Sequence, residues 1–420
     1  MKKFIALLLT AFLLALMLGV TVLAEDVPAV LLRVSAEKKD GTTVVIRDYT
    51  VFEDGWNAAM ELASNSKEMN KNGYARVIVD LYADWNAVDG QFTEEFFNGK
   101  GFNWDAIYVQ PNVRMTLNLN GHTIDRGLTE CEYNGEVMYI DKRADVIIND
   151  GTITGGFSCN GAGGIHVNGA SVTLNKVNVI GNSVEDDRGA GIALYGGAAL
   201  TMNGGSLSEN SGYVDMEYAA GGGLYVDNSE AVLTDVFISD NLLQYSGFLK
   251  SAACDGAACY VSGGTLTLNR CTIKNNRSDR YGAICVHNGE ATLDECSVTE
   301  NYAGLDGSAI TVNSGTCLVD NSTLVGNVNT KNDSVFEVQF GTLQFSNSEH
   351  DPGIKCNKEG KVMFADVSET PVTVGSLFGG GSLTLIISFA ALVASVASIS
   401  VNLTAKRKKS STEDDATDEE

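Results

Sequence analysis

The sequence is poor in basic residues relative to acidic ones. Its 29 Lys and Arg residues stand against 53 Asp and Glu residues, which gives a net charge of −24. Six acidic residues at the extreme C-terminus balance six basic residues near the two ends, so the middle of the chain carries the whole excess. This charge balance argues against a protein that binds nucleic acid or another polyanion through electrostatic attraction.

Short motifs for metal ions are also missing. The 9 cysteines form no CxxC pair and no spacing typical of a zinc site. No EF-hand loop or calcium-binding nonapeptide repeat occurs, so the best calcium candidate is the acidic run Glu185–Asp187 together with Asp279. We therefore expect no cofactor, with Ca²⁺ as the one alternative.

Proline is scarce, at 4 residues, whereas glycine reaches 45, and much of that glycine belongs to a repeat. Six times, a Gly/Ala-rich turn leads into an apolar residue, and a later Asn closes the unit. The interval from apolar residue to Asn is 17, 18, 17, 17, 17 and 17 residues, whereas the interval from Asn to the next unit varies between 8 and 18. One rigid segment with all length variation in a single turn is typical of a solenoid.

The repeat predicts an all-β, right-handed, single-stranded parallel β-helix. Residues two apart on a strand face the same side, so the apolar positions of each unit should form aliphatic columns along the axis. Each Asn should bond to the next coil or to turn backbone and build a ladder. These structural asparagines are Asn182, Asn210, Asn241, Asn276, Asn301 and Asn327.

Two segments before the repeat, Met115–Ile124 and Val146–Ile153, resemble the opening coils of right-handed parallel β-helix surface proteins. The six units are similar to the Gly-Gly-Ala-Ile and Phe-x-x-Asn repeats of bacterial polymorphic outer-membrane proteins, with an aliphatic residue in place of Phe. The resemblance covers about 75–365 and implies a pectate-lyase-like fold at a cell surface. Those proteins end in a membrane β-barrel, whereas this chain ends in one apolar segment, so their export route does not carry over.

The segment before the solenoid predicts a cap, because an uncovered first coil would leave its core and strand edges open. Alternating residues on both sides of Lys38-Lys39-Asp40-Gly41 indicate a hairpin, and Phe52–Met69 has helical periodicity. We assign residues 25–73 to this cap and residues 74–368 to the β-helix.

Both ends of the chain predict targeting and anchoring. Residues 1–24 have a basic start and a long apolar run, typical of a cleaved secretory signal, with an uncleaved anchor as the alternative. After a linker at 369–382, residues 383–403 form an apolar segment long enough to cross a bilayer as one helix. The charged tail 404–420 begins with basic residues and should be cytoplasmic, which leaves the solenoid outside the cell membrane.

Cys271 and Cys296 each lie five residues before a repeat Asn. They should therefore be neighbours on adjacent coils, at a spacing of ~4.8 Å that a disulfide allows. Two alternatives stay open: a disulfide, or two free buried thiols that pack as small apolar residues.

The longest insertions fall in neighbouring turns, at 211–220 and 242–255, and both are rich in aromatic residues. Aromatic faces beside carboxylates suit neutral sugars, through stacking and hydrogen bonds to hydroxyl groups. The alternative is that these aromatic side chains only cover an exposed strand surface. The candidate ligand-binding residues are Tyr213, Asp215, Glu217, Tyr218, Tyr225, Tyr245, Phe248 and Tyr260.

A second column, four residues before the apolar one, contains Asp255, Arg280 and Asp306 and predicts a charge ladder on three successive coils. Exposed ion pairs of this kind stabilise proteins only weakly, so we interpret this column as structural.

An enzyme is the main alternative to a binding protein, because many right-handed β-helices are polysaccharide lyases or hydrolases. Polygalacturonase-like motifs are absent, since Gly121-His122 is not followed by Gly. The pair Asp186-Asp187 lacks an independent partner for general acid–base chemistry, and His166 fits a turn or surface position. A catalytic site would require clustered Asp or Glu with an Arg or Lys in one groove.

The sequence therefore predicts a membrane-anchored cell-surface β-helix that acts by binding, as an adhesin or glycan-contacting protein, without a catalytic site. Its expected partners are a glycan or the surface of a host or neighbouring cell, and the membrane through its C-terminal helix. No nucleic-acid partner is expected. The alternatives are a carbohydrate-active lyase or hydrolase and a passive structural stalk.

Overall fold

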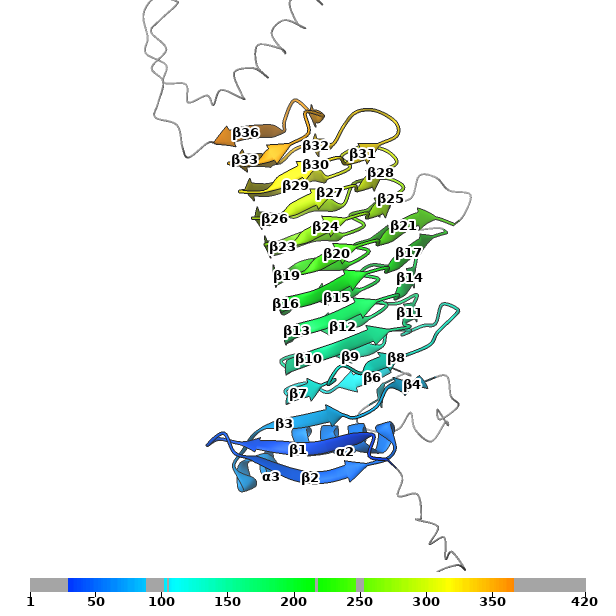
Figure 1. The fold of residues 1–420 in the computed structure, drawn as a ribbon, viewed down its shortest axis with the longest axis vertical. Coiled ribbons are helices and arrows are strands. Elements are labelled where there is room, and N and C mark those ends of the chain that lie inside the picture. Colours follow the sequence, from blue (N-terminus) through cyan, green and yellow to red (C-terminus); the bar gives the residue numbers. More distant parts are fainter. Residues whose placement is uncertain (1–28, 88–101, 104–105, 216–217, 247–252, 366–420) are drawn as a thin grey trace, which may run out of the picture.

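The computed structural model describes residues 29–87, 102–103, 106–215, 218–246 and 253–365. Over these residues the chain winds into a long solenoid whose strands stack side by side along its axis (Figure 1). The described part makes about nine turns, and successive coils pair in parallel and in register. The predicted β-solenoid is thus confirmed, while the signal, linker, membrane helix and tail lie outside the described residues.

The cap begins with an antiparallel hairpin of β1 (Leu32–Lys38) and β2 (Thr43–Tyr49). β1 also pairs antiparallel with β3 (Tyr74–Leu81), and the other edge of β3 pairs in parallel with β7 (Arg114–Asn118). The hairpin therefore covers the edge that the first strand of the solenoid would otherwise expose.

Two helices complete the cap where the sequence predicts one over Phe52–Met69. They are α2 (Phe52–Ser64) and α3 (Ser66–Asn72). The break falls at Asn65, whose side chain accepts a hydrogen bond from the backbone N–H of Glu68 at 3.1 Å and so caps α3.

Each coil has up to four short strand segments, some of which join into one longer strand. The first segments are β6 (Ala106–Val109), β9 (Met138–Ile140), β12 (Ile165–Asn168), β15 (Ile192–Tyr195), β32 (Phe336–Val338) and β35 (Ile354–Cys356). Second segments follow in β7, β10 (Asp145–Thr154), β13 (Ser171–Ile180), β16 (Ala199–Ser208), β33 (Thr342–Ser346) and β36 (Lys361–Ala365). First and second segments join into one strand in β19 (Leu224–Thr234), β23 (Cys259–Asn269), β26 (Ile284–Asp294) and β29 (Ile310–Asp320).

After a sharp bend the same large sheet continues in β4 (Trp85–Asn86), β8 (Thr123–Asp125), β20 (Phe237–Ser239), β24 (Thr272–Lys274), β27 (Ser297–Thr299), β30 (Thr323–Val325) and β34 (Glu349–His350). A separate parallel sheet contains β11 (Phe157–Ser158), β14 (Ser183–Glu185), β17 (Ser211–Val214), β21 (Leu242–Tyr245), β25 (Arg277–Ser278), β28 (Tyr302–Ala303) and β31 (Val328–Asn329). The remaining strands are β5 (Phe102–Asn103), β18 (Tyr218–Ala220) and β22 (Ala253–Asp255).

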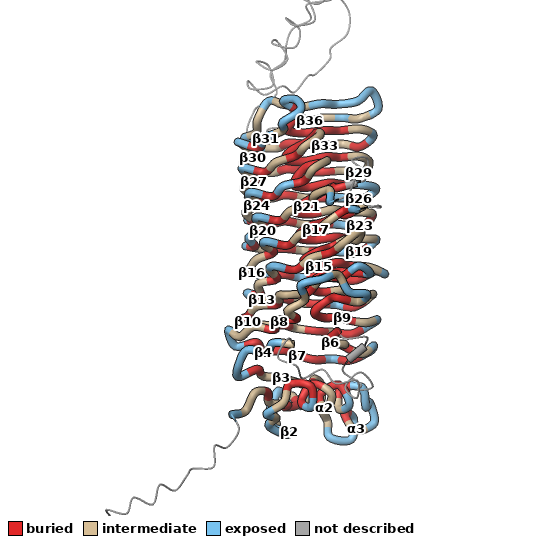
Figure 2. Tube along the Cα trace, turned by 90° about the vertical axis from the view of Figure 1, so that its right-hand side faces the viewer, coloured by how far each residue is buried: buried red, intermediate tan, exposed pale blue. Residues whose placement is uncertain are grey.

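The core is one continuous cluster of buried apolar side chains that extends from Leu32 in the cap to Phe345 near the last coil. Figure 2 shows buried residues along the inside of the coils and exposed residues mainly at their turns. The predicted aliphatic column is fully buried at Ile165, Ile192, Leu224, Cys259, Ile284 and Ile310. Because each coil alone could not bury these side chains, stacking is what stabilises the fold.

Left-handed backbone makes the bend before each ladder asparagine. The residue ahead of Asn210 is Glu209, with φ of 57°, and the residue ahead of Asn241 is Asp240, with φ of 58°. A non-glycine residue at positive φ is uncommon, so its repetition at one column marks a required turn. The turn places the following Asn inside the coil, where all six repeat asparagines are buried.

The six asparagines form the expected ladder. In each rung but the last, the side-chain Nδ2 donates to the Oδ1 of the Asn on the next coil, at 2.8 to 3.1 Å. The same Oδ1 also accepts the backbone N–H of the preceding Asn, as Asn276 does from Asn241 at 3.2 Å. The ladder thus satisfies bend amides that would otherwise be buried without partners.

Cys271 and Cys296 lie on adjacent coils, and the N–H of Ser297 donates to the Cys271 carbonyl at 2.9 Å. The side chains are 1% and 3% exposed, and both thiols are free in this structure. They belong to the main core and pack there as small apolar residues.

Candidate functional site

The two long insertions pack against each other. β17 pairs in parallel with β21, and β18 pairs in parallel with β22. Between them lies a small separate core of Val214, Ala219, Leu243, Cys254 and Ala257, with Tyr245 against it. The insertions are therefore ordered extensions of neighbouring coils over their described residues; Glu217 and Phe248 lie outside the described residues.

Tyr218, Tyr225 and Tyr260 come together, as the sequence suggests. The Tyr225 and Tyr260 rings stack with centroids 5.6 Å apart, and the guanidinium of Arg188 lies 4.1 Å from the centre of the Tyr218 ring. Tyr225 is only 4% exposed, because it packs in a small cluster with Ala193 and Ala220. A ligand could not reach the Tyr225 ring face in this arrangement.

Other candidate residues lie apart from this cluster. Tyr213 is half-buried and packs against Phe157, with ring centroids 6.1 Å apart. The backbone N–H of Asp215 donates to the Asp186 carboxylate at 3.0 Å. Tyr245 is half-buried, and burial raises its pKa to about 12.

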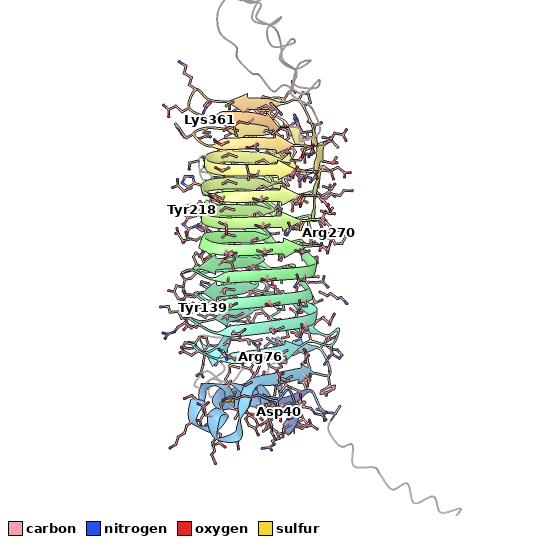
Figure 3. All side chains as sticks on the ribbon, turned by 90° about the vertical axis from the view of Figure 1, so that its left-hand side faces the viewer. Asp40, Arg76, Tyr139, Tyr218, Arg270 and Lys361 are labelled. Atoms are coloured by element: carbon pink, nitrogen blue, oxygen red, sulfur yellow. The ribbon has the colours of Figure 1, made fainter. Side chains whose placement is uncertain are left out.

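A cavity of about 810 Å³ opens next to this cluster, toward the N-terminal coils. We call it the coil pocket. Figure 3 shows Tyr139 and Tyr218 along one edge of the solenoid, with Arg270 along the opposite edge. The pocket is lined by Tyr133, Asn134, Glu136, Tyr139, Asn160, Gly161, His166, Asn168, Asp187, Arg188 and Tyr195.

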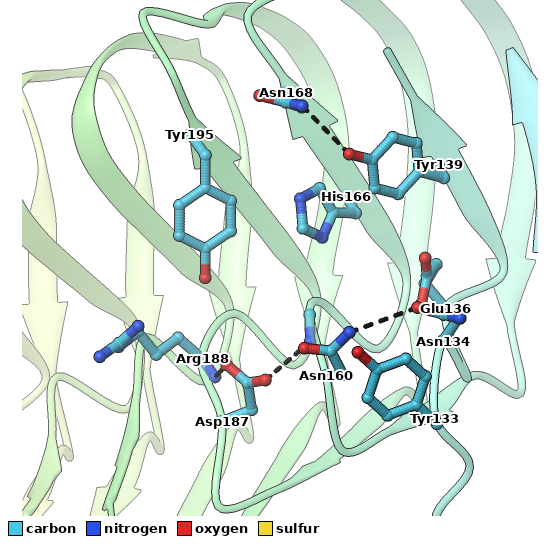
Figure 4. A pocket seen from close by; sticks show the side chains of 11 residues that line it. Tyr133, Asn134, Glu136, Tyr139, Asn160, His166, Asn168, Asp187, Arg188 and Tyr195 are labelled. Atoms are coloured by element: carbon cyan, nitrogen blue, oxygen red, sulfur yellow. Dashed lines mark hydrogen bonds between the residues drawn. The ribbon is translucent and has the colours of Figure 1, made fainter. Parts of the chain in front are cut away.

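The floor of the coil pocket is a column of aromatic rings. His166 lies between Tyr139 and Tyr195, with centroid distances of 4.6 and 5.0 Å (Figure 4). In the strand register, the residue opposite His166 is the small Ala193. Tyr195, two residues after Ala193 on the same strand, places its ring next to His166 instead. The column continues from Tyr195 to Tyr225 at 5.7 Å, so it joins the predicted tyrosine cluster to the pocket.

Glu136 contributes a buried carboxyl group to the pocket wall. The residue is 2% exposed, and its Oε2 has no hydrogen-bond partner in the described structure. Burial raises its pKa to about 7; Arg126 opposes this shift and the negative charge of Asp187 adds to it. Arg126 holds the backbone here, because its Nη1 donates to the Glu136 carbonyl oxygen at 2.7 Å.

Asp187 supplies a second carboxylate from the turn after β14. Its Oδ2 accepts the N–H of Gly161 at 2.7 Å, and its Oδ1 accepts the N–H of Arg188 at 2.8 Å. A Cβ on Gly161 would lie 2.6 Å from His166 Nδ1, so only glycine allows this turn to approach the ring. Asp187 therefore fixes the turn that brings Gly161 and Asn160 to the pocket.

His166 has a shielded ring nitrogen without a partner. Its Nδ1 is buried and makes no hydrogen bond in the described structure. Burial lowers the pKa of His166 to about 4, so the imidazole is neutral near pH 7. Its sequence pattern indicates a turn or surface residue, whereas the structure places it on strand β12 in the pocket floor.

Arg188 connects the coil pocket to the tyrosine cluster. Its guanidinium lies 5.5 Å from the centre of the Tyr225 ring as well as over Tyr218, an arrangement favourable for cation–π contacts. Burial raises the pKa of nearby Tyr195 above its usual value, and the positive charge of Arg188 opposes this shift. Its cationic group is thus held at the end of the pocket.

Sequence reasoning did not identify Tyr133, Glu136 or His166 as site residues. Tyr133 and Glu136 belong to an irregular loop outside the six repeats, so no column aligns them with other coils. His166 does occupy the same outward column as Tyr225 and Tyr260, and extending that column toward the N-terminus would have found it.

The expected charge column needs a correction. Isolated bridges pair Asp255 and Asp306 with Tyr281 instead of Arg280, one residue away. Arg280 still reaches Asp255, with Nε 3.6 Å from Oδ1. Burial raises the pKa of Asp255 to about 6, and Arg280 opposes this shift.

Asp306 pairs instead with Lys355, whose Nζ lies 2.7 Å from Asp306 Oδ2 and 3.3 Å from Glu337 Oε1. Glu337 is 3% exposed, and its pKa is raised mainly by burial, against the influence of Lys355. The real charge cluster near the last coils is therefore one lysine between two buried carboxylates.

The calcium candidates hold backbone amides. Asp186 accepts from Asp215, Asp187 from Gly161, and the Asp279 carboxylate accepts the N–H of Tyr245 at 3.1 Å. Within the described ranges, no group of three or more His, Cys, Asp or Glu side chains is arranged to hold a metal ion. Among those same residues no helix is long and apolar enough to span a bilayer, and the expected membrane helix at 383–403 lies outside them.

The strand topology and stacked coils define a parallel β-solenoid. A family model described as the right-handed β-helix region matches residues 105–358, and the chain belongs to that family. No curated protein and no solved structure matches the chain. The more specific resemblance to polymorphic outer-membrane proteins, which the family match does not address, therefore stays a prediction.

Proposed function

We propose that this chain is a non-catalytic, membrane-anchored surface protein whose coil pocket binds a neutral saccharide. The observation that carries the proposal is the combination of aromatic rings and polar side chains around one cavity. Tyr139, His166 and Tyr195 form the floor, and Asn160 and Asp187 lie across from them (Figure 4). Apolar surface with a few well-placed polar groups is the usual composition of a small-molecule site.

The stacked floor offers ring edges more than ring faces, because each ring covers its neighbour. Tyr133 differs, since it is 71% exposed and lies at the rim of the pocket. A sugar ring stacked on Tyr133 would direct its hydroxyl groups toward the amide and carboxyl groups inside. Tyr133 is therefore the aromatic residue that we expect to contribute most to binding.

The charges of the pocket favour a neutral ligand. Asp187 and the cationic Arg188 have opposite signs, and Glu136, with a pKa raised to about 7, is about half protonated at neutral pH. A polyanion would meet these carboxyl groups and a chain with a net charge of −24. We therefore favour a neutral saccharide over an acidic polymer such as pectate.

The location at a membrane rests on sequence alone. The apolar segments at 1–24 and 383–403, with the basic residues after the second, support an exported solenoid held by one helix. A partner on a neighbouring cell or host surface would then meet the pocket from outside.

A glycoside hydrolase is the second candidate, because the pocket meets the condition that an enzyme would need. Glu136 and Asp187 are carboxyl groups from different coils, and Arg188 lies beside them. Their environments differ: Glu136 is buried with a raised pKa, whereas Asp187 accepts two backbone N–H bonds. A protonated acid beside an ionised carboxylate is the pairing that glycoside hydrolysis uses.

One experiment separates these candidates. The full-length chain is applied to an array of immobilised neutral and acidic glycans, and the protein retained on each glycan is measured. The glycans are then released, and their lengths are determined by mass spectrometry. Retention of neutral glycans at their original length supports a binding protein, and shortened products support a hydrolase. If no glycan is retained or shortened, the coil pocket does not bind sugars and a passive stalk is the better interpretation.

A further inference from the structure

Two cysteines meet at the rim of the coil pocket. Cys131 precedes the loop that carries Tyr133, and Cys159 precedes Asn160 and Gly161 in the turn of the next coil. An isolated parallel bridge joins Glu132 to Ser158, the residues next to these cysteines. The N–H of Cys159 donates to the Glu132 carbonyl at 3.0 Å, so the two segments are held together by backbone bonds.

The bridge places both thiols on one side of the pair of segments. Successive side chains on a strand point to opposite faces, so Cys131 and Cys159 both lie on the face opposite to Glu132 and Ser158. Cys131 and Cys159 are therefore diagonal neighbours, and the Cys159 thiol is close enough to raise the pKa of Cys131. Diagonal neighbours in a regular sheet have Cα atoms ~7–8 Å apart, which exceeds the ~4.4–6.8 Å that a disulfide spans. Closing the bond therefore requires a small shift of the irregular segment that begins at Cys131.

Access to solvent distinguishes this pair from the other cysteines. Cys159 is exposed and Cys131 is partly exposed. Cys271 and Cys296 also touch, but they are buried in the core where no external reagent can reach them. Cys356 is exposed on the last coils, far along the chain from both pairs.

We propose that Cys131 and Cys159 form a reversible disulfide that ties the Tyr133 loop to the turn at Asn160. This bond would join two walls of the coil pocket across adjacent coils. The segment 131–136 has no regular strand of its own before β9, so a covalent link to Cys159, directly after β11, would restrict its motion. The consequence for ligand binding rests on the proposed function, whereas the bond itself does not.

The oxidant in this step is a low-molecular-weight disulfide. The exposed Cys159 thiolate attacks one sulfur of the oxidant, which forms a mixed disulfide and expels one thiolate. The Cys131 thiolate then attacks the Cys159 sulfur, which forms the Cys131–Cys159 bond and expels the second thiolate. The two protons given up by the cysteines end on the two released thiols, and the two electrons of the cysteine pair reduce the external disulfide.

The pKa of the Cys131 thiol controls the rate of the second step. Burial, the neighbouring Cys159 and the charge of Glu185 hold the pKa of the Cys131 thiol above its usual value. Since the thiolate is the reacting form, ring closure should become faster as the pH rises from 7 to 9.

The test uses the full-length chain with excess oxidised glutathione, followed by peptide mapping without reduction. The expected result is a cross-linked peptide that contains Cys131 and Cys159, formed equally in the matched control Cys271→Ser. Cys131→Ser should instead leave glutathione attached at Cys159. A stable glutathione adduct at Cys159 in the unmodified sequence, or a cross-link between other cysteines, would overturn the proposal.

A second measurement follows the loop directly by hydrogen exchange. After oxidation, the backbone amides of residues 132–136 should exchange at least about five-fold more slowly than in the reduced chain. Unchanged exchange in a chain with the mapped cross-link would show that the bond does not restrain the Tyr133 loop. Neither readout involves a sugar, so failure of the proposed saccharide site would leave both results interpretable.

Discussion

The side-chain Nδ2 of Asn241 donates to the Oδ1 of Asn276 on the next coil at 2.8 Å. The same amide group donates to the Leu207 carbonyl on the preceding coil at 2.9 Å. Asn241 thus connects three successive coils at the point where each coil bends. This relationship explains why an amide side chain, with donors and an acceptor together, recurs at that position.

Replacing Asn241 with Ala should destabilise the solenoid strongly. The change removes the Nδ2 donor to the Leu207 carbonyl and the Oδ1 that accepts both the backbone N–H and the Nδ2 of Asn210. The Asn210 backbone N–H loses its side-chain acceptor, whereas its Nδ2 keeps the bond to the Val179 carbonyl. Each buried orphan group costs roughly 1–3 kcal/mol, so we expect a loss of about 3 kcal/mol or more in the free energy of unfolding. Denaturant unfolding monitored by circular dichroism measures the loss.

The matched control is Asn203→Ala. Asn203 is exposed at the end of an outer asparagine ladder, where its Nδ2 donates to Asn175 Oδ1 at 2.9 Å. Water can replace this bond, so the cost should stay below about 1 kcal/mol. Equal losses in the two variants would contradict a special role for the buried ladder.

Much of the fold follows from spacing in the sequence, because identical side chains at a constant interval can only be buried by stacking. The columns at Ile165 and Asn182 and the contact between Cys271 and Cys296 are of this kind. Local capping is harder to foresee, and Asn65 divides a helix that its apolar periodicity presents as continuous.

The candidate site was only half predictable for a related reason. Tyr225 and Tyr260 share a column and could be placed, but whether Tyr225 is accessible depends on how the turn at Ala220 packs against it. Tyr133 and Glu136 lie in a loop without periodicity. Their meeting with Asp187 depends on tertiary contacts that no interval in the sequence encodes.

Lys355→Met should destabilise the last coils in a pH-dependent way. The change removes the cation that lies 3.3 Å from Glu337, a buried carboxyl group whose pKa burial already raises. Loss of one partner from a fully buried pair costs roughly 3–5 kcal/mol. Here only the carboxyl groups are buried and Lys355 is 45% exposed, so the loss should be smaller, and protonation of the carboxyl relieves part of it. Stability should therefore fall more at pH 8 than at pH 5, as measured by guanidinium unfolding at both pH values.

The control for Lys355 is Lys274→Met. Lys274 forms an ion pair with Glu300 at 3.2 Å, but both side chains are largely exposed to solvent. Such surface pairs contribute less than about 1 kcal/mol, so this variant should resemble the unmodified chain at both pH values. A loss in Lys274→Met as large as that in Lys355→Met would refute the explanation by burial.

Glu136→Gln should flatten the dependence of stability on pH. Burial raises the pKa of Glu136 from 4.5 to about 7, so its contribution to stability is full below pH 4.5 and is lost as the pH rises through 7. Over that pH range, the free energy of unfolding of the unmodified chain should fall by up to roughly 3 kcal/mol. Glu136→Gln should not show this fall. The exposed Glu290→Gln should not alter the curve, and parallel curves for all three chains would contradict the raised pKa.

His166 should make the free energy of unfolding depend on pH in the acid range. Its pKa is lowered from 6.5 to about 4, so its contribution to stability is present above pH 6.5 and is lost as the pH falls through 4. His166→Asn should remove part of that acid sensitivity. Unfolding of both chains at pH 3.5, 5 and 7 tests this, and equal losses toward low pH would show that His166 already titrates normally.

Gly161→Ala should disturb the pocket without unfolding the solenoid. A methyl group there would lie 2.6 Å from His166 Nδ1 and displace that ring from the pocket floor. The control is Gly197→Ala, which also has positive φ, at 76°, but has open space around the added carbon. Both variants should lose about 1 kcal/mol of stability, yet only Gly161→Ala should lose glycan retention.

The saccharide site is tested most directly by glycan retention on the array for Tyr133→Ala beside Phe237→Ala. Both residues are exposed aromatic side chains, at 71% and 59%, but only Tyr133 lines the coil pocket. Loss of one stacked aromatic contact should weaken retention of neutral glycans at least about ten-fold in Tyr133→Ala, with no change in Phe237→Ala. Full retention by Tyr133→Ala, or equal loss in both variants, would contradict a saccharide site in the coil pocket.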